Sequence, residues 1–535
     1  MKKTIMCLLA TILVLNSCNH KKPNSAQIQQ KEPITITVSM PNDSKVAYDD
    51  ENVGKGALTW EAGDQVLVVG KKDGKCIKGE KFTLSSGAGT DKATFTGPQI
   101  PGATSFDIYC GDVELKGDEV KIRMDRQKQV GNNNTAHLKK SICLHGCTYD
   151  SDPNSYYWTC FLEMKSAIMK LELSNLPTDI GTLQSITWGV ITKDGSGIYE
   201  ISAQPLELEN ITTSTNSLIA YVSFSPEEIK PMSNGGCFYV MLVGSMGKKV
   251  IEIPTKKGKE YRPGERYTAK ISKATSEWKE YIPILDRVAE RNLDQTGKQF
   301  APDWKNTTSG YFSFEEAGNL FTEVEGEQKN LTIDGKKYFL PSKEDWYPIF
   351  YESGGEISYI APHHNIGTRI EKIDFFGKKV SYKAEYKCYK ERVLAGLRYQ
   401  GGGNFQRSAW RYSFTNNPNT SGESSDKGKY LVVEYIFLGP TDRTSIEQIA
   451  NDEYWDKASN RIIRYFPACG EKIPSATRAN FLGDTGYYWS STEEYNKEMH
   501  NQRVFNVYFT GESSAYTASM EKYNSSKMVI RPFKR

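Results

Sequence analysis

The fold is decided by a stretch near the end of the chain, Gly486-Tyr-Tyr-Trp-Ser-Ser-Thr-Glu-Glu-Tyr495. An alternating run follows it, Val504-Phe-Asn-Val-Tyr-Phe509, and the chain closes on a short apolar strand, Met528-Val-Ile530. A strand at a chain end usually pairs with an earlier strand, because its backbone groups and its edge would otherwise stay open. The sequence therefore predicts a compact terminal module that its own last strand completes.

Composition favours a β-rich globular protein and gives no sign of catalysis. The chain has 535 residues, enough for about three or four domains at roughly 150 residues each. Aromatic residues make up 12 %, which favours β structure, and the net charge of +3 argues against a nucleic-acid partner. The chain has six His and lacks Gly-x-Ser-x-Gly, P-loop and His-Glu-x-x-His motifs. We therefore expect neither an enzyme nor a cofactor.

The N-terminus has the pattern of an exported protein. Lys2-Lys3 precedes an apolar run, Thr4 to Leu15, that is too short to span a membrane and predicts a signal peptide. The run ends in Leu15-Asn-Ser-Cys18, which resembles the lipobox of bacterial lipoproteins. That resemblance implies a signal peptide over residues 1–17 and acylation of Cys18, which would hold the protein on the cell outer membrane. The alternative is a plain secretory signal with an incidental Cys.

The residues after Cys18 predict a tether but leave its membrane face open. Residues 18–32 are polar and lack a hydrophobic period, so we expect a flexible segment. In similar Bacteroidetes lipoproteins, acidic residues just after the Cys favour the outer face. Here the Cys is followed by Asn-His-Lys-Lys. Eight further Cys remain after Cys7 and Cys18, and we expect one or two disulfides at most.

The first folded half has the period of β-strands. Ile34-Thr-Ile-Thr-Val38 alternates with period two, and Trp60-Glu-Ala-Gly-Asp64 predicts a turn into a buried strand. Ala93-Thr-Phe-Thr-Gly97 adds a short strand at a spacing typical of a sandwich. These elements predict a β-sandwich.

The order of several motifs resembles the fimbrillin family of Bacteroidetes surface proteins. The motifs are the lipobox, Trp60–Asp64, Ala93–Gly97, Met164-Lys-Ser-Ala-Ile-Met-Lys-Leu-Glu-Leu173, Ala220-Tyr-Val-Ser-Phe-Ser225 and Lys259-Glu-Tyr-Arg-Pro-Gly-Glu-Arg-Tyr-Thr268. The resemblance covers roughly residues 1–275 and implies two consecutive β-sandwiches with transthyretin-like topology, over residues 33–150 and 151–275. It also implies a pilus role or a membrane-anchored relative.

The third region, residues 276–535, is predicted to hold a linker and a further domain. Residues 273–298 are charged, and we interpret them as a linker with one short helix. Tyr338-Phe-Leu-Pro-Ser-Lys-Glu-Asp-Trp346 predicts a helix start, with Ser342 as N-cap and two acids in the first turn. Trp346 and Ile349-Phe350 would face a sheet, and Pro348 would shorten the helix.

Motifs in this third region resemble the FISUMP-type domains of Bacteroidetes, which are similar to the C-type lectin-like fold. The motifs are Tyr338–Trp346, Val393-Leu-Ala-Gly-Leu-Arg398, Ser408-Ala-Trp-Arg-Tyr412, Tyr487-Tyr-Trp-Ser-Ser-Thr492 and Val529-Ile-Arg531. The resemblance implies an α+β C-type-lectin-like domain after the two sandwiches, in a mainly β multidomain protein. Long inserts separate the motifs, which departs from the family pattern.

The loops of the third region hold the candidate ligand-binding residues. Glycine runs and polar loops on a rigid scaffold are typical of variable binding surfaces, here around residues 400–404 and 416–426. The candidates are Tyr399, Asn404, Asn417, Asn419 and Asp426. Asn417-Pro-Asn419 partly matches the calcium motif of sugar-binding lectin-like domains, but it lacks a carboxylate, and no Trp-Asn-Asp occurs. We therefore predict no metal.

Three other side-chain groups have two interpretations each. The spacing of His137, Cys143, His145 and Cys147 matches no common zinc finger, which favours loop residues. Cys388 and Cys469 lack the pattern of relatives that oxidise protein cysteines. The third group consists of aromatic residues. They could form an exposed platform for a ligand or part of the hydrophobic core, and we favour the core for the two tryptophans of the group. It consists of Tyr399, Phe405, Trp410, Tyr412, Tyr487, Tyr488 and Trp489.

Together the resemblances predict a lipid-anchored, adhesin-like envelope protein, either a fimbrial tip or a solitary surface protein. The alternatives are a structural shaft or anchor subunit, and an envelope enzyme with convergent catalytic groups. Shaft subunits of the family mature by a cut after an Arg near the N-terminus, and this chain has no Arg before Arg123. The expected partners are the membrane, fimbrial subunits, and a host or bacterial glycan or protein.

Overall fold

The computed structural model is mostly β, as the sequence predicts, with short helices between many strands. It describes residues 33–41, 59–117, 119–124, 126–148, 157–193, 199–211, 216–228, 237–254, 260–272, 278–304, 308–326, 328–350, 357–358, 367–375, 378–398, 407–416, 429–439, 442–510, 514–521 and 525–535. Within these residues, no helix has the length and apolar character needed to cross a membrane. The described chain forms two compact units, which we call unit 1 and unit 2.

Unit 1 lies within Met1–Ser39, Thr59–Ile108 and Cys147–Phe161. Its strands follow the order β10 (Tyr157–Phe161), β1 (Ile34–Ser39), β4 (Lys92–Gly97), β3 (Lys75–Ser86), β2 (Gln65–Lys72) and β5 (Ser105–Cys110), which continues two residues beyond the unit. The predicted strand at Ile34–Val38 is confirmed: Ile36 and Val38 are buried, and β1 pairs antiparallel with β4 and parallel with β10. Trp60 packs against Phe95 with ring centroids 4.7 Å apart.

Unit 2 lies within Met40–Leu58, Tyr109–Gly146 and Leu162–Arg535, and its first part is a sandwich of two sheets. One core contains side chains of both sheets, such as Leu171 and Val222 from one and Ile186 and Val240 from the other. The first sheet consists of β15 (Ser217–Phe224), β12 (Ala167–Ser174) and β18 (Arg266–Ile271). The facing strands are β19 (Lys279–Glu280), β17 (Lys248–Pro254), β16 (Cys237–Gly244), β13 (Leu183–Lys193) and β14 (Tyr199–Glu209).

A short strand, β8 (Gln127–Val130), links the two sheets of this sandwich. Its backbone pairs in parallel with β14. On its other side, the Gln129 amide accepts from Tyr221 N at 3.0 Å and donates to Ile219 O at 2.9 Å. Gln127 does the same for the backbone of Ser223, at 2.7 and 2.8 Å. Side chains therefore replace a strand at this edge of β15.

The chain passes between the two units more than once near the boundary predicted at residue 150. β8 precedes that position and belongs to unit 2, whereas β10 follows it and joins β1 in unit 1. Shorter elements complete this region of unit 2: β6 (Val113–Lys116), β7 (Glu119–Ile122), α2 (Leu138–Ser141), β9 (Leu144–Cys147), which ends one residue beyond the unit, β11 (Glu163–Met164), and the 3₁₀ helices Thr178–Ile180 and Pro226–Glu228.

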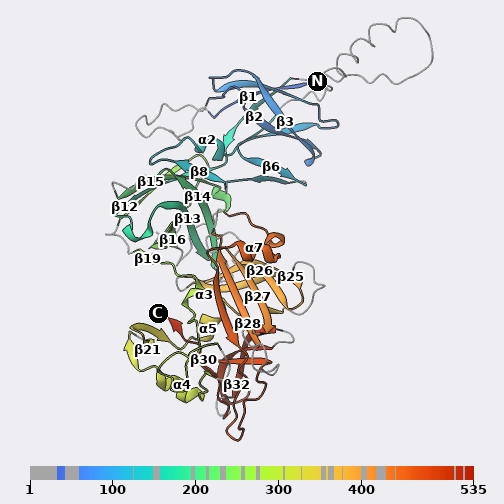
Figure 1. The fold of residues 1–535 in the computed structure, drawn as a ribbon. Coiled ribbons are helices and arrows are strands. Elements are labelled where there is room, and N and C mark those ends of the chain that lie inside the picture. Colours follow the sequence, from blue (N-terminus) through green and yellow to red (C-terminus); the bar gives the residue numbers. More distant parts are fainter. Residues whose placement is uncertain are drawn as a thin grey trace, which may run out of the picture. The chain divides into compact units, whose positions relative to one another are not determined.

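An antiparallel meander forms the centre of the C-terminal part of unit 2, and Figure 1 shows its long strands side by side. The strands are β24 (Gly367–Phe375), β25 (Lys378–Lys390), β26 (Val393–Arg398), β27 (Ser408–Asn416), β28 (Lys429–Phe437) and β29 (Ile462–Pro467). Helices α6 (Ile446–Ile449) and α7 (Asp452–Lys457) pack on it through a small core that includes Leu397 and Trp455.

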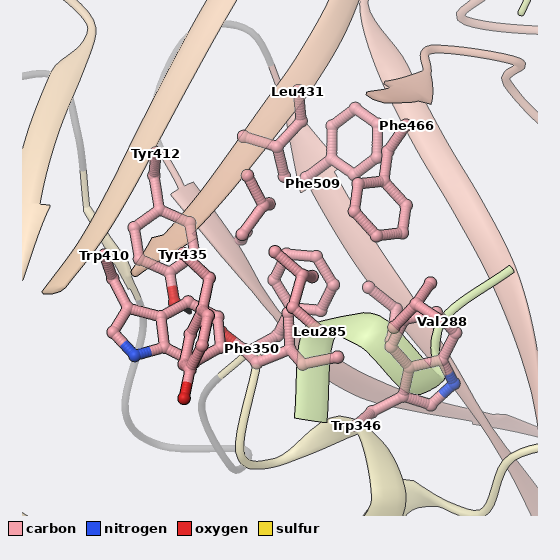
Figure 2. Close-up of a cluster of buried hydrophobic side chains, with 14 of the residues drawn as sticks. Leu285, Val288, Trp346, Phe350, Trp410, Tyr412, Leu431, Tyr435, Phe466 and Phe509 are labelled. Carbon is pink, nitrogen blue, oxygen red and sulfur yellow. Dashed lines mark hydrogen bonds between the residues drawn. The ribbon is translucent and has the colours of Figure 1, made fainter. Parts of the chain in front are cut away.

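Two further sheets complete the C-terminal part. One contains β23 (Ile357–Ser358), β32 (Ser514–Glu521), β31 (Asn501–Thr510) and β30 (Thr485–Asn496), and the other contains β20 (Glu323–Glu325), β21 (Gln328–Ile333), β22 (Lys336–Phe339) and β33 (Phe533–Lys534). The largest core combines side chains of the meander with Trp346, Phe350 and Phe509 (Figure 2). The predicted strand at Val504–Phe509 is therefore confirmed as part of β31.

Three short helices lie in the same region: α3 (Ile284–Arg287), α4 (Phe314–Leu320) and α5 (Lys343–Trp346). The predicted N-cap is confirmed, because Ser342 and Asp345 form a reciprocal capping box at the start of α5. The single short helix predicted in residues 273–298 is α3. The linker interpretation fails from Ile284 onward, because Leu285, Val288 and Leu293 are fully buried in the cores.

Candidate functional site

The chain end is hydrogen-bonded on both sides within its own domain. Met528 exchanges two backbone hydrogen bonds with Phe312, at 2.9 and 3.0 Å. On its opposite side, Val529 accepts from Trp489 N at 3.1 Å and donates to Tyr487 O at 3.3 Å. The segment predicted as a strand, Met528–Ile530, forms isolated β-bridges instead of a continuous strand. It lies between two earlier segments of the chain, and one of them is the aromatic stretch that begins at Gly486.

The pairing continues to the last residue. Ile530 O accepts from Leu293 N at 3.0 Å, and Pro532 O accepts from Ala289 N at 2.9 Å. β33 then pairs antiparallel with β22, and Arg535 N donates to Lys337 O at 3.1 Å. The prediction that the final strand completes its own module is confirmed. We call residues 527–535 the closing segment.

Arg531 is fully buried at the centre of the closing segment. Its guanidinium donates to the side chain of Asn292 at 2.6 Å and to backbone carbonyls of Ala289, Glu290 and Tyr465 at 2.7–3.0 Å. Burial lowers the pKa of Arg531 to about 10, so the group is still charged at neutral pH. The hydrogen bonds compensate the charge and tie three separate segments together.

A buried ion pair joins two strands of the meander, β24 and β26. Arg398 and Glu371 are 1 % and 3 % exposed, and Arg398 Nε lies 3.0 Å from the Glu371 carboxylate. Arg398 also donates to Tyr412 Oη at 2.6 Å, and its guanidinium stacks over the ring of Trp410. Burial raises the pKa of Tyr386, which donates to Glu371. The pair is thus buried among aromatic rings, which indicates a structural role.

The predicted aromatic platform is mainly core. Trp410, Tyr412, Tyr488 and Trp489 are buried, and Tyr487 is half-buried. The core interpretation of the two tryptophans is confirmed: both indole nitrogens are also satisfied inside the protein, Trp489 Nε1 by Phe312 O at 2.7 Å and Trp410 Nε1 by the side chain of Ser408 at 2.9 Å. Tyr399 and Phe405 lie outside the described residues.

The remaining predicted site residues fall on parts of the chain that the structure does not describe. These are Cys18 and the loop candidates Asn404, Asn417, Asn419 and Asp426. Tyr399 belongs to the same group. Their roles stay predictions.

His137 and Cys143 lie within unit 2 and belong to the group of His137, Cys143, His145 and Cys147. His137 Nε2 lies 2.9 Å from Tyr221 O, and burial lowers its pKa. Cys143 is a buried thiol whose pKa is raised to about 12 by burial, and its backbone N–H donates to Ser166. A metal-binding thiolate needs a low pKa, so this burial argues against Cys143 as a metal ligand. Within unit 1, Cys160 is likewise a buried thiol with a pKa of about 12.

One exposed aromatic group was not predicted from the sequence. Trp304 is 39 % exposed, and its ring packs against Tyr465 of β29 with centroids 5.2 Å apart. Tyr465 in turn contacts Tyr430 of β28 at 6.0 Å. The only signal in the sequence is a Trp in the polar run Asp303-Trp-Lys-Asn306, directly after a Pro.

Comparison with known proteins assigns a family model to the C-terminal part only. Residues 281–533 match DUF8237, a domain of unknown function. The match begins at the segment that contributes Leu285 and Val288 to the core, and it ends within the closing segment. No curated protein matches the chain.

Several solved structures from related bacteria align with up to half of the chain. They include a candidate cell adhesion protein from Bacteroides uniformis, with 12 % identity over 46 % of this chain and 96 % of that one, at a TM-score of 0.24. A fimbrial assembly protein from Parabacteroides distasonis has 14 % identity over 46 % and 94 %, at 0.23. The fimbrial anchor protein Mfa2 from Porphyromonas gingivalis has 12 % identity over 39 % and 77 %, at 0.22. Similarity at this level does not assign a function.

Proposed function

We propose that this chain is a lipid-anchored, adhesin-like protein of the cell envelope, either a fimbrial tip or a solitary surface protein. In this proposal Cys18 carries the lipid, residues 33–150 and 151–275 form a stalk of transthyretin-like sandwiches, and the rest presents a lectin-like binding domain. The observation that supports it best is the closing segment, whose backbone is paired with Phe312 on one side and Trp489 on the other. Because this segment is already paired on both sides, it is not free to be donated to a neighbouring subunit.

The physical argument concerns what a polymerising subunit must supply. In strand-exchange assembly, one subunit donates an extended segment to a groove in the next, and the donated segment must be free in the monomer. Removing residues 527–535 from their own domain would leave the acceptor groups of the Arg531 guanidinium and the backbone groups of Phe312 unpaired inside the protein. Each buried unpaired group costs about 1–3 kcal/mol, so donation of this segment is strongly unfavourable.

One observation favours the second candidate, a structural shaft or anchor subunit. β1 lies between β4 and β10, and its Ile36 and Val38 are fully buried. Loss of β1 would open an apolar groove with two strand edges, which is the shape that accepts a donor strand. Against this candidate, the chain has no Arg before Arg123, so an Arg-specific protease could not release β1 alone.

A binding screen tests the adhesin proposal. The full chain, in detergent or as a Cys18→Ser variant, is applied to arrays of glycans and of extracellular matrix proteins. The proposal predicts saturable binding to at least one class, and competition by the same ligand in solution. Absence of binding to every class, by protein whose melting curve shows a folded state, would reject the adhesin role.

Cell fractionation tests the anchor separately. Cells that make the native chain or Cys18→Ser are separated into membrane and soluble fractions. The proposal predicts that the native chain is found with the outer membrane and carries acyl chains detectable by mass spectrometry, and that the variant is released. An unacylated Cys18 would mean a plain secretory signal.

A further inference from the structure

Trp304 differs from every other tryptophan in the chain. All nine lie in the described residues; seven are buried, Trp278 is half-buried, and Trp304 is the most exposed, at 39 %. The exposed ring is held in place, because its Nε1 donates to Glu290 O at 3.0 Å. A large apolar ring that is fixed and still open to solvent is typical of a binding surface.

Two tyrosines continue the row of rings: Tyr465 packs against Trp304, and Tyr430 packs against Tyr465. Tyr465 meets Trp304 at an interplanar angle of 44°, and Tyr430 meets Tyr465 at 72°. Both tyrosines lie on adjacent antiparallel strands, β29 and β28, and the backbone of Tyr465 also accepts a hydrogen bond from buried Arg531 at 2.7 Å. The row of rings is therefore anchored in the rigid part of the domain, which lowers the entropic cost of binding.

Polar groups of both hydrogen-bonding types lie beside the rings. Asp303 precedes the tryptophan and accepts from Thr308 Oγ1 at 2.8 Å. Arg291 donates to Pro302 O at 2.7 Å. The rim thus combines a carboxylate acceptor with a guanidinium donor.

We propose that Trp304 and Tyr465 form a stacking site for a pyranose ring of a neutral oligosaccharide. One face of a pyranose presents C–H groups, which suit the negative face of an aromatic ring, and its edge presents hydroxyl groups that both donate and accept. The rings and the mixed rim supply these complementary features. This inference rests on the proposed binding role and names its ligand class and its site.

The charges around the site favour a neutral sugar over other ligands. The carboxylate of Asp303 repels anionic sugars. An organic cation would suit an aromatic cage, but Tyr465 packs against Trp304 itself, with the ring planes tilted by 44°, and Arg291 adds a positive charge nearby. A neutral ring that stacks on Trp304 avoids both conflicts.

The test uses the full chain as the Cys18→Ser variant, a panel of neutral oligosaccharides, and calorimetric titration of the best ligand. Trp304→Ala should weaken binding about tenfold or more, the loss expected from about 1.4 kcal/mol of stacking. Trp304→Phe keeps an aromatic face and should bind more tightly than Trp304→Ala. Tyr495→Ala is the matched control, because Tyr495 is a 54 % exposed aromatic residue of the same domain, and it should leave affinity unchanged.

The outcomes separate this inference from the proposal on which it rests. Equal binding by native chain and Trp304→Ala would overturn the site and leave the adhesin role standing. Binding only to proteins, to anionic sugars or to a quaternary ammonium probe would overturn the ligand class. Failure to bind any ligand would reject both. Protection of tryptophan fluorescence from acrylamide by the bound sugar, lost in Trp304→Phe, would support the site independently of any folding defect.

Discussion

At the scale of single residues, Arg531 links three segments that are distant in sequence. Its guanidinium binds Asn292 and the carbonyl groups of Ala289, Glu290 and Tyr465. The planar five-donor fork of Arg can reach several acceptors at once, whereas the ammonium of Lys is a compact group with three donors. The identity of this residue therefore matters beyond its charge.

We predict that Arg531→Lys lowers the free energy of unfolding of the C-terminal domain by about 1–3 kcal/mol, because buried carbonyl groups lose their donors. Urea denaturation followed by near-ultraviolet circular dichroism measures the change. Arg535→Lys is the control, because Arg535 is exposed and its ion pair with Glu325 lies at the surface. Equal stability of the two variants would contradict the role assigned to Arg531.

Buried phenols make stability sensitive to alkaline pH. Burial raises the pKa of Tyr389 and of Tyr430 to about 12, from an ordinary value near 10. Above about pH 10 the unfolded chain loses these protons before the folded chain does, so the folded state loses stability as pH rises towards 12. We predict a melting temperature that falls across this window. The phenolate absorbance of these two side chains, taken as the difference between the native chain and a Tyr389→Phe, Tyr430→Phe double variant, should appear only as the chain unfolds or as the pH approaches 12. Gradual ionisation of these tyrosines in the folded protein near pH 10 would contradict it.

At the scale of elements, strand β30 needs a glycine at position 486. A Cβ on Gly486 of β30 would lie 2.2 Å from the ring of Phe509 on the neighbouring strand β31. That ring belongs to the main core shown in Figure 2, so it has little space to move. The glycine therefore permits the close packing of β30 on β31.

Two Gly→Ala changes in the same domain should have opposite effects. Gly486→Ala should destabilise by about 1–3 kcal/mol through overpacking. Gly318→Ala should stabilise by about 0.5–1 kcal/mol, because Gly318 lies within α4 and a Cβ there has nothing within 4 Å. Differential scanning calorimetry of both variants tests the pair. A stabilising Gly486→Ala would show that β30 does not pack as described.

The side-chain amides of Gln127 and Gln129 in β8 bind the backbone of β15, and we call these hydrogen bonds the amide ladder. The amide ladder gives a further prediction. Gln129→Leu leaves the N–H of Tyr221 without its acceptor and removes one of two donors to the C=O of Ile219, which also accepts from Asn133 N. The unpaired N–H should cost about 1–3 kcal/mol. Lys128→Ala is the matched control in the same strand, because Lys128 is exposed and pairs with Glu209 at the surface. Proteolysis of the region around residues 126–134 should accelerate in Gln129→Leu alone. Equal protection in both variants would contradict the ladder.

Local sequence signals predicted several elements correctly, but they could not predict which residues far apart in the sequence would pair. The cap at Ser342 depends on residues three positions apart. The strand at Ile34–Val38 follows from the alternation of apolar and polar residues. The amide ladder joins Gln129 to Tyr221, and the Arg531 network joins residues more than 200 positions apart, so neither leaves a local pattern. Trp304 was missed because exposure depends on which surface the tertiary fold leaves open.

At the scale of the whole molecule, the closing segment gives the clearest functional argument. Its backbone is paired on both sides, its central Arg531 is enclosed, and its last residue bonds to Lys337. A domain that is complete in itself can present loops and an exposed ring such as Trp304 without recruiting a strand from a neighbour. In the proposed role, a segment held within its own domain is not donated to a neighbouring subunit, which suits a tip or solitary protein better than a shaft subunit.

Immunogold electron microscopy of intact cells that make this chain tests that claim most directly, with antibodies raised against the C-terminal domain. The account predicts label at the cell surface or at the tips of fimbriae, with at most one cluster per fibre. It also predicts that the labelled protein retains β1, as judged by mass spectrometry of the purified fraction. Regular label along the length of the fibres, from chains that have lost β1, would contradict the account and identify a shaft subunit.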